Sequence, residues 1–270
     1  MTRNLVAAPL TRLLLLVPLL AGLALNLAIV ARGAEVIESR TTFQSQGKTI
    51  VVERFEPKAE GRHPAILVVH GSHGLKSTNE FDYHAYARLL ARNGYVAHVV
   101  HYFDRTGHES VVEMATIYKH FAVWGMTVAE AVTHLVRQPN VDPERIGLLG
   151  FSLGAYLSLS VAMFDARVAA VVEYYGGLPD ALARTCTRMP PTLVLHGDAD
   201  TVVPVAEARA LERIFKEKKV PHESRIYPGQ GHGFKGADDR DALDRTLRFL
   251  ERYVKKTAVA EPKTVTSSGS

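Results

Sequence analysis

Short apolar runs recur along the chain, and most of them are bounded by glycine, proline or polar residues. A continuous apolar run of this kind is typical of a strand that is buried on both faces, as in a parallel sheet. Two earlier stretches, 36–43 and 48–55, lie on either side of Gln46-Gly47 and predict an antiparallel pair of strands. The buried strands expected from the apolar runs are 64–70, 95–100, 146–149, 168–173, 191–196 and 224–227.

The segments between these strands carry apolar residues at helical spacing. One helix is expected to begin at a capping box formed by Ser77 and Glu80 and to end at Asn93. The segment 104–120 is polar-rich and predicts a loop with a short helix. Strands that alternate with helices predict an α/β fold with a mostly parallel central sheet and helices on both faces. The remaining helices are expected at 123–137, 155–163, 204–218 and 240–254.

The strand at 146–149 leads into Gly150-Phe151-Ser152-Leu153-Gly154, and a helix follows without a break. A G-x-S-x-G sequence between a strand and a helix is typical of a nucleophile elbow, a tight turn that exposes the serine hydroxyl. The two glycines let the strand and the helix approach closely because they lack Cβ atoms. Ser152 is therefore the candidate nucleophile.

A serine nucleophile needs a base, and the base needs an acid that orients it. Both are sought beyond the carboxyl ends of the strands, where the functional residues of a parallel sheet gather. His232 follows the last strand in a loop with three glycines and is the candidate base. Asp200 follows the strand before it and is the preferred acid, with Asp198 and Glu173 as alternatives. The chain order Ser152, Asp200, His232 is that of the α/β-hydrolases.

An ester hydrolase also needs hydrogen-bond donors for the oxyanion that forms during the reaction. The glycine-flanked turn His70-Gly71-Ser72-His73-Gly74 follows a buried strand and can aim a backbone amide at a carbonyl oxygen. The amide of Ser72 is the first candidate donor. The amide of Leu153, directly after the candidate nucleophile, is the second.

Several stretches match one known family: the His70-Gly71 turn, Tyr-Phe-Asp-Arg-Thr-Gly at 102–107, the elbow at 150–154, Tyr-Tyr-Gly at 174–176, the segment 196–204 and Gly-His-Gly-Phe at 231–234. On these residues the chain from about Glu35 to Val254 resembles the α/β-hydrolase superfamily and, within it, the dienelactone hydrolase-like family. The resemblance implies the α/β-hydrolase fold, with Ser152 as nucleophile, Asp200 as acid and His232 as base.

The chain departs from the dienelactone hydrolase pattern at three positions. Ser152 stands where that family has a cysteine nucleophile, and Gly71 stands where it has a glutamate. Gly236 takes the place of an arginine that holds a substrate carboxylate in the family. We therefore expect a general serine hydrolase that cleaves a small-molecule carboxylic ester, lactone or thioester through an acyl-enzyme, with no metal or organic cofactor.

The N-terminal segment 1–33 contains an apolar run from Leu13 to Ala31 after two arginines and is followed by small residues. This pattern predicts a signal peptide, and the length of the run makes an uncleaved membrane anchor the alternative. Either predicts that the folded part is exported, to the periplasm or the extracellular space. The hydrolase domain is expected over 35–256, and the polar segment 257–270 is expected to be a disordered tail.

The formal net charge of +4 arises partly from three arginines in the first 33 residues, which contain no acidic residue. No clustered basic face is predicted from the rest of the chain, so nucleic acid is not an expected partner. Cys186 is the only cysteine, which excludes an intrachain disulfide. Two other functions share the predicted fold: a peptidase of the prolyl-oligopeptidase type, and a non-catalytic binding protein on the same scaffold.

Overall fold

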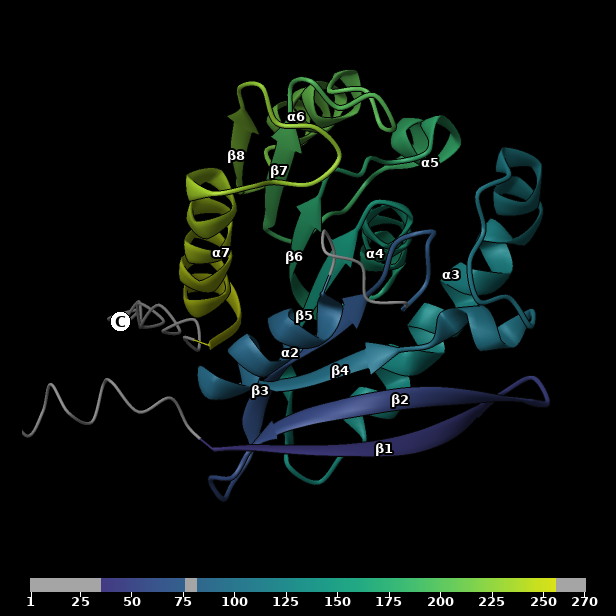
Figure 1. Cartoon of the computed structure of the whole chain (residues 1–270), viewed down its shortest axis with the longest axis vertical. Coiled ribbons are helices and arrows are strands. Elements are labelled where there is room, and N and C mark those ends of the chain that lie inside the picture. Colours follow the sequence, from purple (N-terminus) through teal and green to yellow (C-terminus); the bar gives the residue numbers. More distant parts are fainter. Residues whose placement is uncertain (1–34, 76–81, 256–270) are drawn as a thin grey trace, which may run out of the picture.

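The computed structural model describes residues 35–75 and 82–255. Its eight strands form one sheet in the spatial order β1-β2-β4-β3-β5-β6-β7-β8 (Figure 1). β2 is antiparallel to both of its neighbours, β1 and β4, and every neighbouring pair from β4 to β8 in this order is parallel. The predicted α/β fold with a mostly parallel sheet is confirmed. The strands are β1 (Val36–Ser45), β2 (Lys48–Pro57), β3 (His63–Val69), β4 (Val96–Val100), β5 (Val141–Phe151), β6 (Val168–Tyr174), β7 (Thr192–Gly197) and β8 (His222–Tyr227).

Helices cover both faces of this sheet, as predicted (Figure 1). One core contains Trp124, Leu157 and Phe215, so α3, α4 and α6 pack on the same face. The other core contains Leu90 and Phe249, so α2 and α7 pack on the opposite face. The helical elements are α2 (Tyr83–Arg92), η1 (Tyr102–Arg105), α3 (Met114–Val136), α4 (Leu153–Phe164), α5 (Asp180–Thr185), α6 (Ala206–Glu217), α7 (Ala237–Leu250) and η2 (Glu251–Lys255).

Three helices differ from the sequence prediction. α3 begins at Met114, whereas the sequence predicted a start at 123. The prediction missed the first turns because few of their residues are buried: Tyr118, for example, is 75% exposed, so the apolar pattern there is weak. α5 was not predicted, and it is a six-residue helix with no buried side chain. α2 begins at Tyr83, where Asp82 accepts a hydrogen bond from the Ala85 amide as N-cap. The predicted capping box lies outside the described residues.

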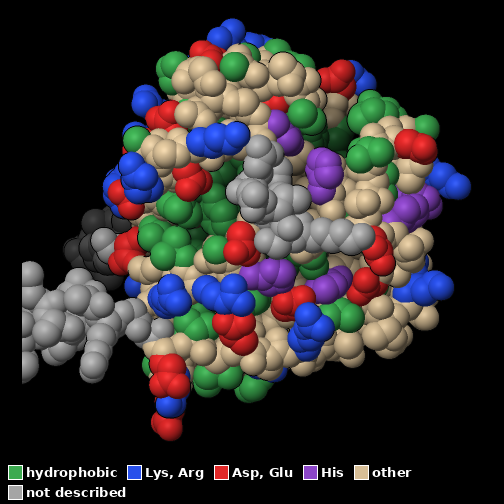
Figure 2. All heavy atoms as spheres, in the orientation of Figure 1, with side chains coloured by type: hydrophobic (Ala, Val, Ile, Leu, Met, Phe, Trp, Pro, Cys, Tyr) green, Lys and Arg blue, Asp and Glu red, His purple; other side chains and the backbone are tan. Residues whose placement is uncertain are grey.

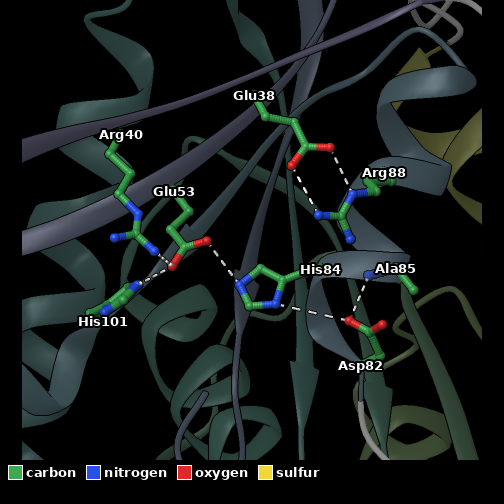
Figure 3. Close-up of polar contacts among 8 residues, drawn as sticks. All are labelled: Glu38, Arg40, Glu53, Asp82, His84, Ala85, Arg88 and His101. Carbon is green, nitrogen blue, oxygen red and sulfur yellow. Dashed lines mark hydrogen bonds and ion pairs between the residues drawn. The ribbon is translucent and has the colours of Figure 1, made fainter. Parts of the chain in front are cut away.

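Polar contacts fix α2 to the β1–β2 hairpin (Figure 3). Arg88 of α2 donates two hydrogen bonds, of 2.7 and 2.9 Å, to the carboxylate of Glu38. His84 Nε2 lies 2.9 Å from Glu53 Oε2, and His101 Nε2 lies 3.0 Å from the other oxygen of the same carboxylate. These hydrogen bonds hold the pKa of Glu53 well below its usual range and raise the pKa of His84. The start of α2 is therefore held firmly on the sheet.

The two ends of the chain contain predictions that the structure does not describe. The signal peptide or anchor predicted at 1–33 and the tail predicted at 257–270 lie outside the described residues. Within 35–75 and 82–255, none of the helices has the length and apolar character to cross a membrane.

Candidate active site

Ser152 lies at the sharp turn between β5 and α4, where the sequence predicts a nucleophile elbow. Its backbone adopts φ 52° and ψ −120°, a conformation that costs free energy for any residue with a Cβ atom. The Ser152 amide donates a 2.9 Å hydrogen bond to the carbonyl of Tyr174, at the end of the neighbouring strand β6. This bond and the following helix hold the strained turn in place.

The two glycines of the elbow are required by close backbone contacts. A Cβ atom on Gly150 would lie 2.5 Å from the carbonyl oxygen of Gly154. A Cβ atom on Gly154 would lie 2.1 Å from the carbonyl oxygen of Val69 at the end of β3. Both distances are far below van der Waals contact, so the G-x-S-x-G pattern is dictated by packing around the turn.

His232 and Asp200 complete a hydrogen-bonded chain with Ser152. His232 Nε2 lies 2.9 Å from Ser152 Oγ, and His232 Nδ1 lies 2.8 Å from Asp200 Oδ2. In this arrangement Nδ1–H donates to the carboxylate, and Nε2 accepts from the serine hydroxyl. The structure thus brings together the three residues selected from the sequence, which come from the ends of β5, β7 and β8.

Asp200 is fixed by its second carboxylate oxygen. Oδ1 accepts hydrogen bonds of 2.8 and 2.9 Å from the amides of Val202 and Val203, and the side chain is fully buried. The two alternative acids have other roles. Asp198 accepts a 2.6 Å hydrogen bond from the Gly229 amide, and Glu173 accepts one of 2.8 Å from the Gly176 amide. Asp200 is the carboxylate that contacts the imidazole.

The loop that carries His232 is tied to the loop after β7. The Ala199 amide donates a 3.0 Å hydrogen bond to the carbonyl of Gln230. Gly197 approaches the same carbonyl so closely that a Cβ atom would lie 2.2 Å from its oxygen. The side chain of Gln230 also spans the loop, because it accepts from the Lys235 amide and donates to Asp238. His232 and Asp200 therefore lie on two loops that hydrogen bonds and close packing tie together.

The turn after β3 lies directly against Ser152. A Cβ atom on Gly71 would lie 3.4 Å from Ser152 Cβ and 3.4 Å from the carbonyl oxygen of Phe151. The next amide along the chain is that of Ser72, and the first amide of α4 is that of Leu153. Within the described residues, neither of these amides donates a hydrogen bond to a protein group.

Three buried aromatic side chains hold this turn. The Gly71 amide donates to the Tyr83 hydroxyl at 3.1 Å, and the Tyr102 hydroxyl donates to the His70 carbonyl at 3.0 Å. His70 Nδ1 lies 2.8 Å from the Gly71 carbonyl oxygen, to which it donates. Burial lowers the pKa of His70 to about 3, so the imidazole is neutral at physiological pH. His70 therefore serves as a structural donor.

Tyr83 is a site residue that the sequence did not identify, whereas Tyr174 and Tyr175 were expected from the sequence to shape the pocket. Tyr83 reaches the turn from α2, and no local pattern around it predicts that contact. Tyr175 packs its ring against His232, with 4.8 Å between ring centroids and an angle of 56°. The sequence placed Tyr175 near the pocket but did not show that its ring contacts His232.

A cavity of about 780 Å³ lies beside His232, between α2, α7 and the loop after β8. Its apolar walls come from Tyr86, Leu89, Phe234 and Leu243. Figure 2 shows hydrophobic side chains gathered in a hollow on this face of the molecule. Charged residues lie at its margin, namely Asp82, Arg92, Lys235 and Asp239. In the described part of the chain, no group of three or more side chains is suited to hold a metal ion.

Comparison with known proteins agrees with this geometry. A model of the dienelactone hydrolase family matches residues 51–265. A carboxymethylenebutenolidase homolog of Mus musculus is 27% identical over 196 residues, which are 69% of this chain and 77% of the relative.

Two solved structures share the fold. A dienelactone hydrolase-like promiscuous phosphotriesterase from metagenomic libraries has a TM-score of 0.70 at 20% identity and covers 81% of this chain and 98% of that one. The acylaminoacyl peptidase of Pyrococcus horikoshii has a TM-score of 0.68 at 18% identity and covers 86% of this chain but 44% of that one. Because the family model spans most of the sequence, this protein belongs to the dienelactone hydrolase family and is a hydrolase of ester bonds.

Proposed function

We propose that the protein is a serine esterase that cleaves a small carboxylic ester, lactone or thioester through a Ser152–His232–Asp200 triad and an acyl-enzyme. The observation that carries this proposal is the continuous hydrogen-bonded chain from Ser152 Oγ to His232 and on to Asp200, at 2.9 and 2.8 Å. No metal or organic cofactor is needed for this chemistry.

The proposed reaction begins when His232 Nε2 takes the proton of Ser152 as the serine oxygen attacks the carbonyl carbon. Asp200 stabilises the imidazolium that forms and keeps Nδ1 protonated. His232 then gives its proton to the leaving alcohol or thiol, which departs and leaves an acyl group on Ser152. Water, activated by the same imidazole, hydrolyses the acyl-enzyme and restores the free hydroxyl.

The oxyanion in this scheme is stabilised by the amides of Ser72 and Leu153. The geometry that supports this role is the close approach of the Gly71 turn to Ser152, where a Cβ atom on Gly71 would lie 3.4 Å from Ser152 Cβ. The amides are held before substrate arrives, so they need no reorganisation when negative charge develops.

The cavity beside His232 supports a substrate with an apolar group of moderate size. Tyr86, Leu89 and Phe234 offer hydrophobic walls, and a cavity of about 780 Å³ is in the range of small-molecule sites. Gly236 stands where the family has a carboxylate-binding arginine, which argues for a neutral ester instead of a dienelactone. A screen of p-nitrophenyl esters of increasing acyl length is expected to show a preference for short to medium apolar acyl chains.

Labelling with a fluorophosphonate probe tests the proposal. The native protein should be labelled on Ser152 and should hydrolyse p-nitrophenyl esters, and Ser152→Ala should lose labelling and about 10⁴-fold or more of kcat. Ser160→Ala is a matched control, because Ser160 lies on α4 and its hydroxyl donates to the Tyr156 carbonyl within the helix. Labelling that persists in Ser152→Ala contradicts the assignment.

A peptidase is the second candidate, since the acylaminoacyl peptidase of Pyrococcus horikoshii has the same fold. The peptidase ranks below the esterase because the family model that matches this chain is that of the dienelactone hydrolases. Comparing the hydrolysis of p-nitrophenyl esters with that of aminoacyl nitroanilides distinguishes the two. A non-catalytic binding protein is supported only if neither substrate turns over and the probe fails to label.

We also propose that the enzyme acts outside the cytoplasm. The apolar run within residues 1–33 supports export, either with cleavage after the run or with retention as an anchor. Expression of the full chain, followed by cell fractionation and N-terminal sequencing, distinguishes a cleaved exported enzyme from an anchored one. An uncleaved protein in the cytoplasmic fraction contradicts both.

A further inference from the structure

Glu173 is a fully buried carboxyl group to which the triad mechanism gives no role. It lies in β6, one residue before the strand ends, and its side chain is closed to solvent. Oε2 accepts a 2.8 Å hydrogen bond from the Gly176 amide, and Oε1 has no hydrogen-bond partner among the described residues. Burial raises the pKa of Glu173 to about 8, so the group is mostly protonated at neutral pH.

The hydrogen bond from Gly176 closes a turn that contacts both the nucleophile and the base. The carbonyl of Tyr174 accepts the hydrogen bond from the Ser152 amide. The ring of Tyr175 lies 4.8 Å from that of His232. Gly176 packs against α4 so closely that a Cβ atom would lie 2.3 Å from Ala155 Cβ. A shift in this turn would therefore displace both Ser152 and His232.

The turn holds Tyr175 in an unfavourable backbone conformation. Its φ of 44° lies in the left-handed region, which is rare for an aromatic residue and costs on the order of 1 kcal/mol. Such a conformation persists only where the surroundings enforce it. Here the Tyr175 amide donates a 2.7 Å hydrogen bond to the Leu195 carbonyl on one side, and the Glu173–Gly176 bond fixes the chain on the other.

We propose that Glu173 is a positioning residue: its hydrogen bond to Gly176 holds Tyr175 against His232 and so sets the geometry of the Ser152–His232 pair. This inference rests on the proposed function of that pair. Glu173 does not touch the reacting atoms, and its effect passes through the turn 174–176.

Ionisation of Glu173 is expected to disturb the same turn. The titratable groups on the surrounding elements are Tyr156 of α4, Glu207 of α6, and His196, Asp200 and His232 of the loops and strand ends beside β6. None of them forms a hydrogen bond or ion pair with Glu173 among the described contacts. Ionisation strengthens the hydrogen bond from Gly176, but it also leaves a buried charge without a counter-charge. We expect this cost to shift the side chain, and the turn that it holds, toward water. The activity should therefore fall as the pH rises past about 8, where Glu173 loses its proton.

The test compares kcat and KM of the native enzyme, Glu173→Gln and Glu173→Leu on a p-nitrophenyl ester from pH 6 to 10. Glutamine is neutral and keeps an oxygen that accepts from Gly176. We expect Glu173→Gln to retain at least about half of kcat at pH 7 and to lack the alkaline fall. Glu173→Leu should lose about 10- to 100-fold in kcat with little change in KM, because substrate contacts are untouched.

Glu56→Gln is the matched control, since Glu56 is a buried carboxyl on β2, which β4, β3 and β5 separate from β6. Its pH profile should match that of the native enzyme. An alkaline fall that persists unchanged in Glu173→Gln overturns the inference, as does an undiminished kcat in folded Glu173→Leu. If Glu173→Leu does not fold, the profile of Glu173→Gln decides alone. Failure of the native protein to react with a fluorophosphonate instead refutes the triad.

Discussion

Asp200 contacts His232 through one carboxylate oxygen and the amides of its own loop through the other. Oδ2 lies 2.8 Å from His232 Nδ1, whereas Oδ1 accepts from the amides of Val202 and Val203. The two amides thus orient the carboxylate. Its other oxygen, Oδ2, accepts from Nδ1–H of His232 and so fixes the tautomer in which Nε2 carries no proton and can accept one.

Replacing Asp200 by Asn should therefore remove the tautomer control without removing the fold. An amide can donate to Nδ1, which leaves the proton on Nε2 and blocks proton transfer from Ser152. We expect kcat on p-nitrophenyl esters to fall by about 10³- to 10⁴-fold at pH 7 with little change in KM. Asp198→Asn is the control, because Asp198 lies in the same loop but contacts the Gly229 amide. Equal losses in the two variants would contradict the role of Asp200.

Removing the hydroxyl of Tyr83 should loosen the turn at Gly71 and Ser72. Tyr83→Phe leaves the Gly71 amide without its 3.1 Å acceptor, and a buried unpaired donor costs about 1–3 kcal/mol. The unpaired Gly71 amide should shift the turn and move the neighbouring Ser72 amide, the proposed oxyanion donor, out of position. We therefore expect kcat to fall about tenfold. In Tyr95→Phe the lost hydroxyl has no hydrogen-bond partner among the described residues, so the same change should leave kcat unaltered. Steady-state kinetics on one ester decides between them.

The proximity of Ser152, His232 and Asp200 was predictable because each residue follows a strand in a short segment that contains glycine. Ser152 and His232 are marked by glycine neighbours, and the strand pattern places both at one edge of the sheet. Asp200 was already preferred over Asp198 from the sequence, and the contacts agree, since Asp200 meets His232 whereas Asp198 accepts from the Gly229 amide.

The supporting contacts could not be predicted from local patterns. Tyr83 reaches Gly71 because α2 is anchored to β1 and β2 by side chains such as Arg88, which lies far along the chain from Glu38. Tyr175 contacts His232 because its backbone is left-handed, a conformation that the sequence gives no reason to expect of tyrosine. The spacing of apolar residues in a strand or helix predicts which residues are buried. It does not predict these contacts, which depend on where each side chain points in the folded protein.

Adding a methyl group at the elbow should destabilise the fold. In Gly154→Ala the new Cβ would lie 2.1 Å from the Val69 carbonyl oxygen, so α4 must move away from β3. We expect a loss of at least about 3 kcal/mol in the free energy of unfolding, measured by urea denaturation. Gly125→Ala in α3 is the control, since that Cβ would meet only Leu157 of α4, at 3.9 Å. Gly125→Ala should raise the free energy of unfolding by up to about 1 kcal/mol. If both variants changed the free energy of unfolding by the same amount, the elbow would not be tightly packed.

The buried, neutral imidazole of His70 should make the protein sensitive to acid. Its pKa is lowered from 6.5 to about 3, so between these pH values the unfolded chain binds a proton that the folded state does not. Stability therefore falls as the pH falls through this window, by about 5 kcal/mol if the whole shift is expressed. His70→Gln carries no titratable group, so its free energy of unfolding should fall less steeply between pH 6.5 and pH 3, while both proteins behave alike between pH 7 and pH 8. Urea denaturation at each pH measures the difference, and parallel curves down to pH 3 would show that His70 is protonated without cost.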